Sequence, residues 1–364
     1  MKILYLAFLI LFSGLATAAP KTCVDYVDFL RLHHVNGMFT KYKTYSKTII
    51  KLNEFQNIHL SSSFKSAGGV TGTYNKSDFV ISQFVEVASQ KLEDRANSSE
   101  VEDELYSALH KFTNGELVTV RKDILDVMVQ ILAEAYVEVS AGTSGLVDYQ
   151  SLLAALTSQL DGCSRTVVVA HSQGNFFANI AVAELYSNYR FPGGWALSDY
   201  PMLGIMSIAN PADNVGGSVS DIYNNLMGHI TNNGDLVMAL VQLTLGSIPA
   251  NFDSGVLNGL GHGIVDDYLG LEPQAQFIAN EIISIANEMT PMPLFNQHSI
   301  SSSAFDSFGA SRKSQILDLK FSRSGPYRYT SVPESVIDGF TNADSHGRFF
   351  NSEIRDVYPY ERIE

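Results

Sequence analysis

The most informative stretch of the sequence is a short apolar run followed by a serine, Val167-Val168-Val169-Ala170-His171-Ser172-Gln173-Gly174. The β-branched run at residues 166–170 is typical of a strand buried on both faces, as strands of a parallel sheet are. Residues 175–186, which follow it, have the pattern of a helix. The stretch therefore predicts a buried strand that turns sharply into a helix, with the serine at the turn.

Ser172 has the neighbours that a nucleophile at such a turn requires. Ala170 and Gly174 are small and lie two residues before and after it, which relieves crowding where a tight turn projects the hydroxyl beyond the sheet. The N-terminus of the following helix can stabilise a developing oxyanion. Serine near small residues also occurs in ordinary turns, but the strand, the pattern and the helix together favour a nucleophile.

The surrounding chain alternates between strand and helix patterns. The predicted elements are strands at 26–35, 203–209 and 228–231, a helix at 42–54, and one or two strands within the Ser-rich stretch 58–74. This alternation indicates an α/β fold in which helices cover both faces of a mostly parallel sheet. Apolar residues at helical spacing predict a helical insertion at about 79–160. The insertion can roof Ser172, although some of its helices are expected only to cover the sheet.

The turn around Ser172 resembles the elbow of the α/β-hydrolase family, particularly that of compact bacterial lipases and esterases with the motif Ala-His-Ser-x-Gly. The likeness spans about residues 26–288 and is specific only at the turns. It implies an α/β-hydrolase-type sheet and the activity of a serine carboxylic-ester hydrolase. It also implies that the catalytic residues follow the chain order serine, acid, histidine.

The same resemblance implies the position of an oxyanion hole. Lipases of this kind carry His-Gly-x at the end of an early strand, and here Asn36-Gly37-Met38 has Asn36 in place of that histidine. By this match the backbone N–H groups of Met38 and Gln173 are the two donors. Asn-Gly is also an ordinary turn dipeptide, so the motif has a second reading.

A serine hydroxyl needs a histidine base, and usually a carboxylate that orients it. Downstream of Ser172 and within this domain the chain has only His229 and His262. His229 falls inside a predicted strand, whereas His262 lies in a glycine-rich loop that precedes a helix. Since catalytic groups are commonly placed on loops, His262 is the predicted base, with an ordinary exposed loop histidine as the alternative.

The predicted acid is Asp235, which comes just past the end of a predicted strand, where the family supplies its carboxylate. Asp213, after the preceding strand, is the alternative. Asp266 and Asp267 are expected to be solvated charges on a helix. A surface aspartate remains the default interpretation for each of these residues.

The apolar stretch 236–248 and the helical insertion suggest a hydrophobic acyl-binding cleft. The expected reaction is hydrolysis of carboxylic esters with apolar acyl groups, in which Ser172 attacks, His262 transfers the proton and water releases the acyl group. The expected partner is a small-molecule or lipid ester, with transient membrane-surface contact allowed. No cofactor is expected, and no metal, since His and carboxylate residues lack zinc-ligand spacing. The alternatives are an acyltransferase and a non-catalytic binding protein.

The N-terminus has the pattern of a secretory signal at residues 1–18, with a lysine, an apolar run and Ala16-Thr17-Ala18. A secreted or periplasmic protein is therefore expected, with the hydrolase domain at 19–295. In an oxidising compartment Cys23 and Cys163 could pair or remain two thiols. The net charge of −14 argues against a nucleic-acid partner.

A separate small domain is predicted at residues 297–364. Residues 316–321 and 327–332 alternate around a turn, which indicates a β-hairpin, and 333–340 can form a helix. The piece resembles the KTSC domain in Tyr327-x-Tyr329, Ser345-x-Gly347 and the ending Tyr358-x-Tyr360. Its eight Lys and Arg against nine Asp and Glu do not support phosphate binding. It is interpreted as a docking module of unknown ligand, or as an appendage that stabilises the hydrolase domain.

Overall fold

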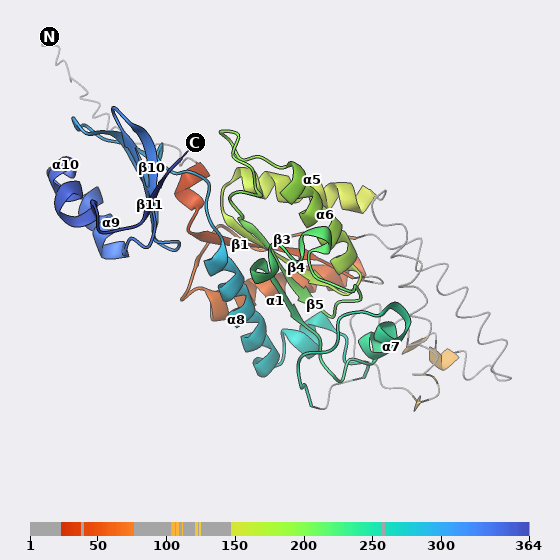
Figure 1. Cartoon of the computed structure of the whole chain (residues 1–364). Coiled ribbons are helices and arrows are strands. Elements are labelled where there is room, and N and C mark those ends of the chain that lie inside the picture. The colour runs from red at the N-terminus through yellow and green to blue at the C-terminus, as the bar shows by residue number, and fades with distance from the viewer. Residues whose placement is uncertain are drawn as a thin grey trace, which may run out of the picture.

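The computed structural model describes residues 23–37, 40–75, 103–105, 107–108, 111, 121–122, 124, 147–255 and 259–363. Within these residues the chain forms two lobes, each with its own sheet (Figure 1). The predicted signal peptide and most of the predicted helical insertion lie outside the described residues. Among the described helices, none has both the length and the apolar character needed to cross a membrane.

The larger lobe is built on a parallel sheet, as the alternating sequence pattern predicts. The strand order is β2-β1-β4-β5-β6, with β3 also paired to β1, and every pairing is parallel. The strands are β1 (Phe29–Val35), β2 (Lys65–Ser66), β3 (Thr71–Thr73), β4 (Arg165–His171), β5 (Leu203–Ile208) and β6 (Met227–Ile230). Strand β4 is fully buried in the middle of this order, which places Ser172 at the centre of the carboxyl edge.

Helices cover both faces of this sheet. Figure 1 shows the sheet between α5 and α6 on one side and α8 on the other. The helices are α1 (Tyr42–Phe55), α5 (Val147–Asp161), α6 (Gly174–Asn188), α7 (Leu236–Leu245) and α8 (Glu272–Glu288). Shorter helical turns are η1 (Cys23–Tyr26), η2 (Gln56–Leu60), η4 (Gly217–Val219), η5 (Asn224–Leu226) and η6 (Ile264–Tyr268).

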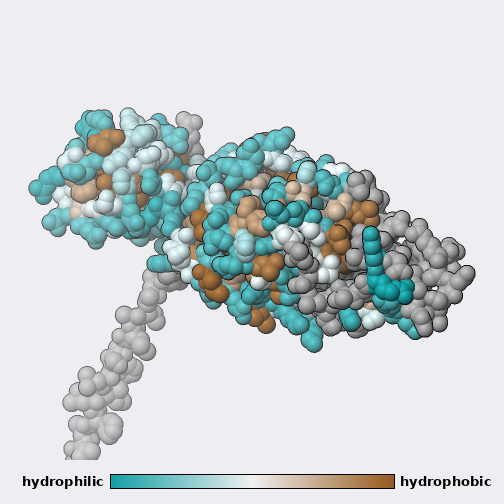
Figure 2. Space-filling view, turned by 90° about the horizontal axis from the view of Figure 1, so that it is seen from below, coloured by the Kyte–Doolittle hydropathy of each residue, from teal (hydrophilic) through white to brown (hydrophobic). Residues whose placement is uncertain are grey.

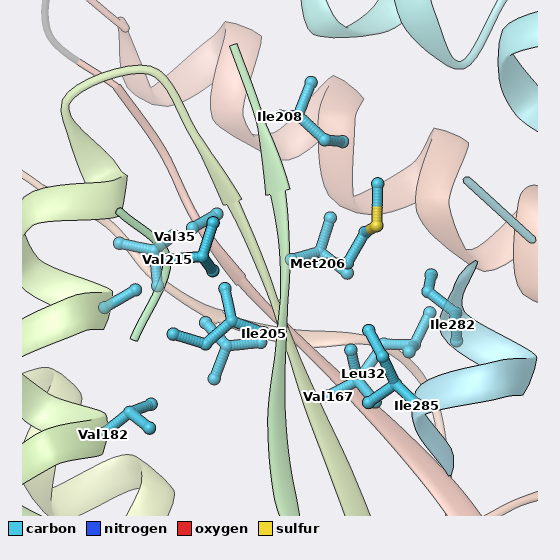
Figure 3. Close-up of a cluster of buried hydrophobic side chains, with 14 of the residues drawn as sticks. Leu32, Val35, Val167, Val182, Ile205, Met206, Ile208, Val215, Ile282 and Ile285 are labelled. Carbon is cyan, nitrogen blue, oxygen red and sulfur yellow. The ribbon is translucent and has the colours of Figure 1, made fainter. Parts of the chain in front are cut away.

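Alternate residues of each strand fill the two sides of the core. Ile205 and Met206 are consecutive on β5 and point to opposite faces, as the pleat of a strand requires (Figure 3). Ile205 lies on the side of Val182 from α6, whereas Met206 lies on the side of Ile282 from α8. These side chains are buried and belong to one continuous cluster.

One segment differs in detail from the sequence patterns, and another agrees with them. Residues 58–60 belong to the stretch in which one or two strands are predicted, but they continue the helix from α1 as η2. Phe55 and Leu60 are buried and hold this turn against the core. Helix α5, at the end of the predicted insertion, covers the sheet. Its Leu152, Leu156 and Leu160 recur every four residues and are fully buried.

A disulfide joins Cys23 to Cys163, with the two Cα atoms 5.1 Å apart. Cys163 lies in the buried turn between α5 and β4, and Cys23 begins the first described helical turn. The bond therefore ties the segment that leads into β1 to the segment that leads into β4, across a sequence separation of 140 residues.

The smaller lobe has an antiparallel sheet in the order β11-β10-β9-β8-β7. Its elements are β7 (His298–Ser299), β8 (Phe305–Ser311), β9 (Ile316–Phe321), β10 (Gly325–Tyr329), α9 (Glu334–Thr341), α10 (His346–Phe349), η7 (Phe350–Ile354) and β11 (Tyr360–Arg362). The hairpin predicted from the sequence is β9 and β10, in which Tyr327 faces Leu319. A separate hydrophobic cluster forms the core of this lobe. Figure 2 shows it as a distinct body beside the larger lobe.

Buried charged side chains join the lobes. Arg328 of β10 forms a buried ion pair with Asp318 of β9 at 2.8 Å, and its guanidinium also donates to the carbonyl oxygen of Pro291 in the linker. Arg165 of β4 donates from the opposite direction to the Ser314 hydroxyl at 2.7 Å. Because both guanidinium groups are buried and donate hydrogen bonds at the boundary, the two lobes have a defined contact.

Removal of the disulfide should destabilise the larger lobe. We expect the double variant Cys23→Ser/Cys163→Ser to lose about 2 to 5 kcal/mol of the free energy of unfolding, because the unfolded chain regains the freedom of a long closed loop. Urea denaturation with and without dithiothreitol measures this. The reductant should lower the stability of the wild type and leave that of the variant unchanged. Equal midpoints for the oxidised wild type and the variant would contradict the expectation.

Candidate active site

Ser172 has the backbone conformation of a strained elbow. Its φ is +58°, in the left-handed region that residues other than glycine seldom adopt. Its N–H donates to the carbonyl oxygen of Ile208 at 3.0 Å, which anchors the turn to β5. A Cβ atom at position 174 would lie 2.6 Å from the carbonyl oxygen of Val35. Gly174 is therefore required for the first turn of α6 to pack against the end of β1.

The three side chains predicted to act together lie in one chain of hydrogen bonds. The Ser172 Oγ is 2.9 Å from His262 Nε2, and His262 Nδ1 is 2.8 Å from Asp235 Oδ2. All three residues are buried. In this geometry a neutral His262 can donate through Nδ1 to the carboxylate and accept the hydroxyl proton at Nε2.

Each of these residues is positioned by its local structure. Asp235 caps the N-terminus of α7, where its Oδ1 accepts from the N–H of Met238 at 3.0 Å. His262 follows Gly261, which has a φ of +67° and so permits the turn that brings the imidazole to the sheet edge. The N-cap of α7 and the turn at Gly261 thus place Asp235 and His262 beside Ser172 at the edge of the sheet.

The sequence alternatives lie elsewhere. His229 is within β6, as its sequence context predicts, and Asp213 is exposed beyond the end of β5. Asp266 is exposed, as expected for a solvated charge. Asp267 is a correction, because it is buried and its Oδ2 accepts from the N–H of Gly263 at 2.8 Å. A short helical turn folded back onto the loop, rather than a solvated helix, accounts for this difference.

Of the two predicted oxyanion donors, only Gln173 lies within the described residues. Gln173 follows Ser172 at the start of α6 and is buried, whereas Met38 lies outside the described residues. Gly37 lies against Ser172, because a Cβ atom there would be 2.6 Å from the Cβ atom of that serine. Any larger residue at position 37 would displace the serine.

An amide network holds the end of β1 against the elbow. Asn36 Oδ1 accepts from the N–H of Asn75 at 2.8 Å, and Asn75 Nδ2 donates to Gln173 Oε1 at 3.1 Å. Sequence reasoning missed Asn75, since a lone asparagine 98 residues before Gln173 carries no local signal. The network explains why an asparagine at position 36 suits this site.

His171 is a second residue that the sequence reasoning did not assign. Its Nε2 is 3.0 Å from the carbonyl oxygen of His262, so its neutral ring can donate to the loop that carries His262. Burial, followed by the nearby His262 and His34, lowers the pKa of His171 well below 6.5. A neutral His171 places no competing positive charge beside His262.

Two further buried histidines lie on β1. Burial lowers the pKa of His33 to about 3, with smaller contributions from the neighbouring His34 and Arg31. Burial also lowers the pKa of His34 to about 4, against a raising effect from its hydrogen bond to the carbonyl oxygen of Val169. Both rings are therefore neutral at the pH of most cells. Among the described residues, no cluster of three or more His, Cys, Asp or Glu side chains could hold a metal ion.

The fold and site together define an α/β chain with a hydroxyl, an imidazole and a carboxylate in series and a separate antiparallel domain. Residues 301–358 match the KTSC domain family. The chain is 39% identical over 66 residues to an uncharacterized protein of Stutzerimonas stutzeri (strain A1501), and the match covers 18% of this chain and 93% of that protein. Through its C-terminal domain, the chain belongs to the KTSC family.

Two other relatives match a similar share of the chain. A protein of Tsukamurella paurometabola is 38% identical over 56 residues, which are 15% of this chain and 84% of that protein. The crystal structure of a KTSC domain protein from Yersinia pestis is 33% identical and covers 18% of this chain and 94% of that chain, with a TM-score of 0.18. The family match at residues 301–358 confirms the KTSC domain predicted from the sequence.

The buried histidines should make the fold sensitive to acid. In the unfolded chain, His33 and His34 take up protons near pH 6.5. In the folded state the same two side chains stay neutral until about pH 3 and 4, respectively. The unfolded state therefore binds more protons as the pH falls below 6.5, and folding stability is lost in that window. We expect about 2 kcal/mol of loss per buried histidine between pH 7 and 5.

Urea denaturation at pH 7 and pH 5 measures this loss. His34→Gln should reduce the loss of folding stability between pH 7 and pH 5 by about 2 kcal/mol, the contribution of one buried histidine. His298→Gln, which alters an exposed histidine, is the matched control. Identical pH dependence in the wild type and His34→Gln would contradict the assignment of a buried neutral ring.

Proposed function

We propose that the larger lobe is a serine hydrolase of the α/β-hydrolase type that cleaves carboxylic esters with apolar acyl groups. The observation that carries this proposal is the hydrogen-bonded series from Ser172 Oγ through His262 to Asp235, at 2.9 Å and 2.8 Å. Nucleophile and base within hydrogen-bond reach, with the base oriented by a carboxylate, is the arrangement that activates a serine hydroxyl.

The reaction follows from the roles of these groups. His262 Nε2 takes the proton of Ser172 as Oγ attacks the ester carbonyl carbon, and the resulting imidazolium is stabilised by Asp235. His262 then gives that proton to the leaving alcohol, which leaves an acyl group on Ser172. Water, deprotonated by the same imidazole, then attacks the acyl carbon. The bond from that carbon to Ser172 Oγ breaks, the imidazolium returns its proton to Oγ, and the carboxylic acid leaves.

The start of α6 supports stabilisation of the tetrahedral intermediate. Its N-terminus lies directly after Ser172, so its positive dipole end is directed toward the carbonyl oxygen of a bound ester. The backbone N–H of Gln173 is one proposed donor to the oxyanion. Met38 is the second, as implied by the resemblance to lipases and by the contact of Gly37 with Ser172.

The choice of an apolar acyl group rests on α7. This helix begins immediately after Asp235 and has the sequence Leu-Val-Met-Ala-Leu-Val-Gln-Leu-Thr-Leu. Val237 and Val241 are buried, whereas Leu236 is 39% exposed beside the acid. An exposed apolar side chain at that point supports a hydrophobic substrate surface.

The disulfide supports an exported protein, because such bonds persist mainly in oxidising compartments. We propose a secreted or periplasmic location on this basis, together with the signal pattern at residues 1–18. The KTSC domain is proposed to be a docking or stabilising appendage, and its buried contacts at Arg165 and Arg328 favour the stabilising role.

A fluorophosphonate probe tests whether Ser172 is an activated nucleophile. The wild-type protein should be labelled at a stoichiometry near one, and Ser172→Ala should not be labelled, because only an activated serine reacts with such probes. Gel fluorescence with thermal melting as a folding control gives the result. A folded wild type that stays unlabelled would leave only a non-catalytic binding function. Labelled protein that turns over aryl esters only when an acceptor alcohol is added would indicate an acyltransferase.

The identity of the acid is tested by two matched substitutions. Asp235→Asn should lower kcat for p-nitrophenyl acetate by about 10²- to 10⁴-fold, because an amide no longer fixes the tautomer of His262. Asp213→Asn removes the exposed carboxylate and should leave kcat within about twofold of the wild type. Steady-state kinetics on both variants measures this. The reverse ranking would assign the acid to Asp213.

A further inference from the structure

A tyrosine that no part of the proposed mechanism uses lies directly against the acid. Tyr268 ends the helical turn η6, and its ring is fully buried. Its hydroxyl is 2.9 Å from Asp235 Oδ2, the same oxygen that faces His262 Nδ1. The tyrosine hydroxyl and the His262 imidazole therefore share one oxygen of the carboxylate.

Among the described residues, three donors contact this carboxylate and are divided between its two oxygens. The N–H of Met238 donates to Oδ1, while His262 Nδ1 and the Tyr268 hydroxyl share Oδ2. The terminal torsion of an aspartate has a broad energy minimum, so one donor on Oδ1 leaves the orientation of Oδ2 poorly defined. A second fixed donor on Oδ2 defines it.

The Tyr268 hydroxyl is itself held in place as a donor. It accepts a hydrogen bond from the backbone N–H of Asn232 at 3.2 Å, which leaves its proton directed toward Asp235. Burial, and then the charge of Asp235, raises the pKa of Tyr268 well above 10. The hydroxyl therefore stays protonated wherever the fold is stable.

The same short segment carries the base and this tyrosine. His262 lies just before η6 and Tyr268 at its end, and between them the N–H of Gly263 donates to Asp267 while the N–H of Asp267 donates to the carbonyl oxygen of Gly263. The turn is closed on itself by these bonds. A displacement of the segment would move the base and the tyrosine together relative to Asp235.

We propose that Tyr268 is a positioning residue of this site, whose hydroxyl orients the Asp235 carboxylate toward His262 so that the base is held in line with Ser172. The inference rests on the proposed hydrolase function and deepens it. Tyr268 acts through Asp235 and does not touch the reacting atoms. By donating to Oδ2 it also withdraws charge from the carboxylate, which helps to keep the proton on the imidazole during the reaction.

The substitution Tyr268→Phe removes only the hydroxyl and tests the proposal. We expect kcat for p-nitrophenyl acetate, and the rate of fluorophosphonate labelling, to fall about tenfold, because a hydrogen bond to a charged group is lost. KM should stay within about twofold, since the substrate does not contact Tyr268. The matched control is Tyr186→Phe, which removes a buried hydroxyl bonded to the carbonyl oxygen of Leu203, at the opposite edge of the sheet.

A double-mutant cycle separates positioning from a general effect on the fold. In the Asp235→Asn background, Tyr268→Phe should reduce the labelling rate by less than about twofold, because the group through which it acts is already impaired. Equal losses in both backgrounds would overturn the proposal, as would wild-type kcat in Tyr268→Phe. A Tyr268→Phe variant that fails to fold while Tyr186→Phe folds would also overturn it, since the hydroxyl would then serve the fold. A wild type that is not labelled would instead refute the hydrolase function.

Discussion

The site depends on one close approach, that of the first turn of α6 to the end of β1. Only a hydrogen atom fits at position 174 against the carbonyl oxygen of Val35, and Ser172, two residues earlier, has a left-handed conformation beyond the buried β4 strand. The remaining parts then meet the serine from separate segments. Asp235 is the N-cap residue of α7, and His262 directly follows the turn at Gly261. The cost of the strained backbone is offset by the burial of β4 and by the anchoring of the turn to β5.

The sequence predicted those features whose cause is local. The β-branched run, the small residues beside Ser172 and the helix pattern after it lie within twenty residues, so the parallel strand and the elbow could be read directly. That Ser172, His262 and Asp235 lie close together could be expected only from the order of the catalytic residues along the chain in the family whose elbow this turn resembles. Tyr268 and Asn75 could not be found, because each contacts its partner across a long separation and neither residue type is unusual in its own context. Strand β8 was not predicted either, since its Ser and Gly residues interrupt the apolar alternation.

The neutral polar residues around the site form a second layer with a common electrostatic character. His171, His34 and Tyr268 are buried and uncharged at neutral pH, and each makes a hydrogen bond to the backbone or to Asp235. Such groups orient their neighbours without adding charge in a region of low dielectric constant. Two buried charged groups outside the site, Arg165 and Arg328, lie at the boundary with the KTSC domain. The site and the domain boundary therefore differ in their polar groups: neutral donors lie around Ser172, and arginine hydrogen bonds join the two domains.

The most direct test of this account is a crystal structure of the protein after reaction with a fluorophosphonate. The account predicts a phosphorus atom bonded to Ser172 Oγ, with the phosphonyl oxygen about 3 Å from the backbone nitrogen of Gln173 and His262 still in contact with Asp235. An adduct on another residue, or a folded protein that carries none after prolonged exposure to the reagent, would contradict the claim that the elbow presents an activated serine.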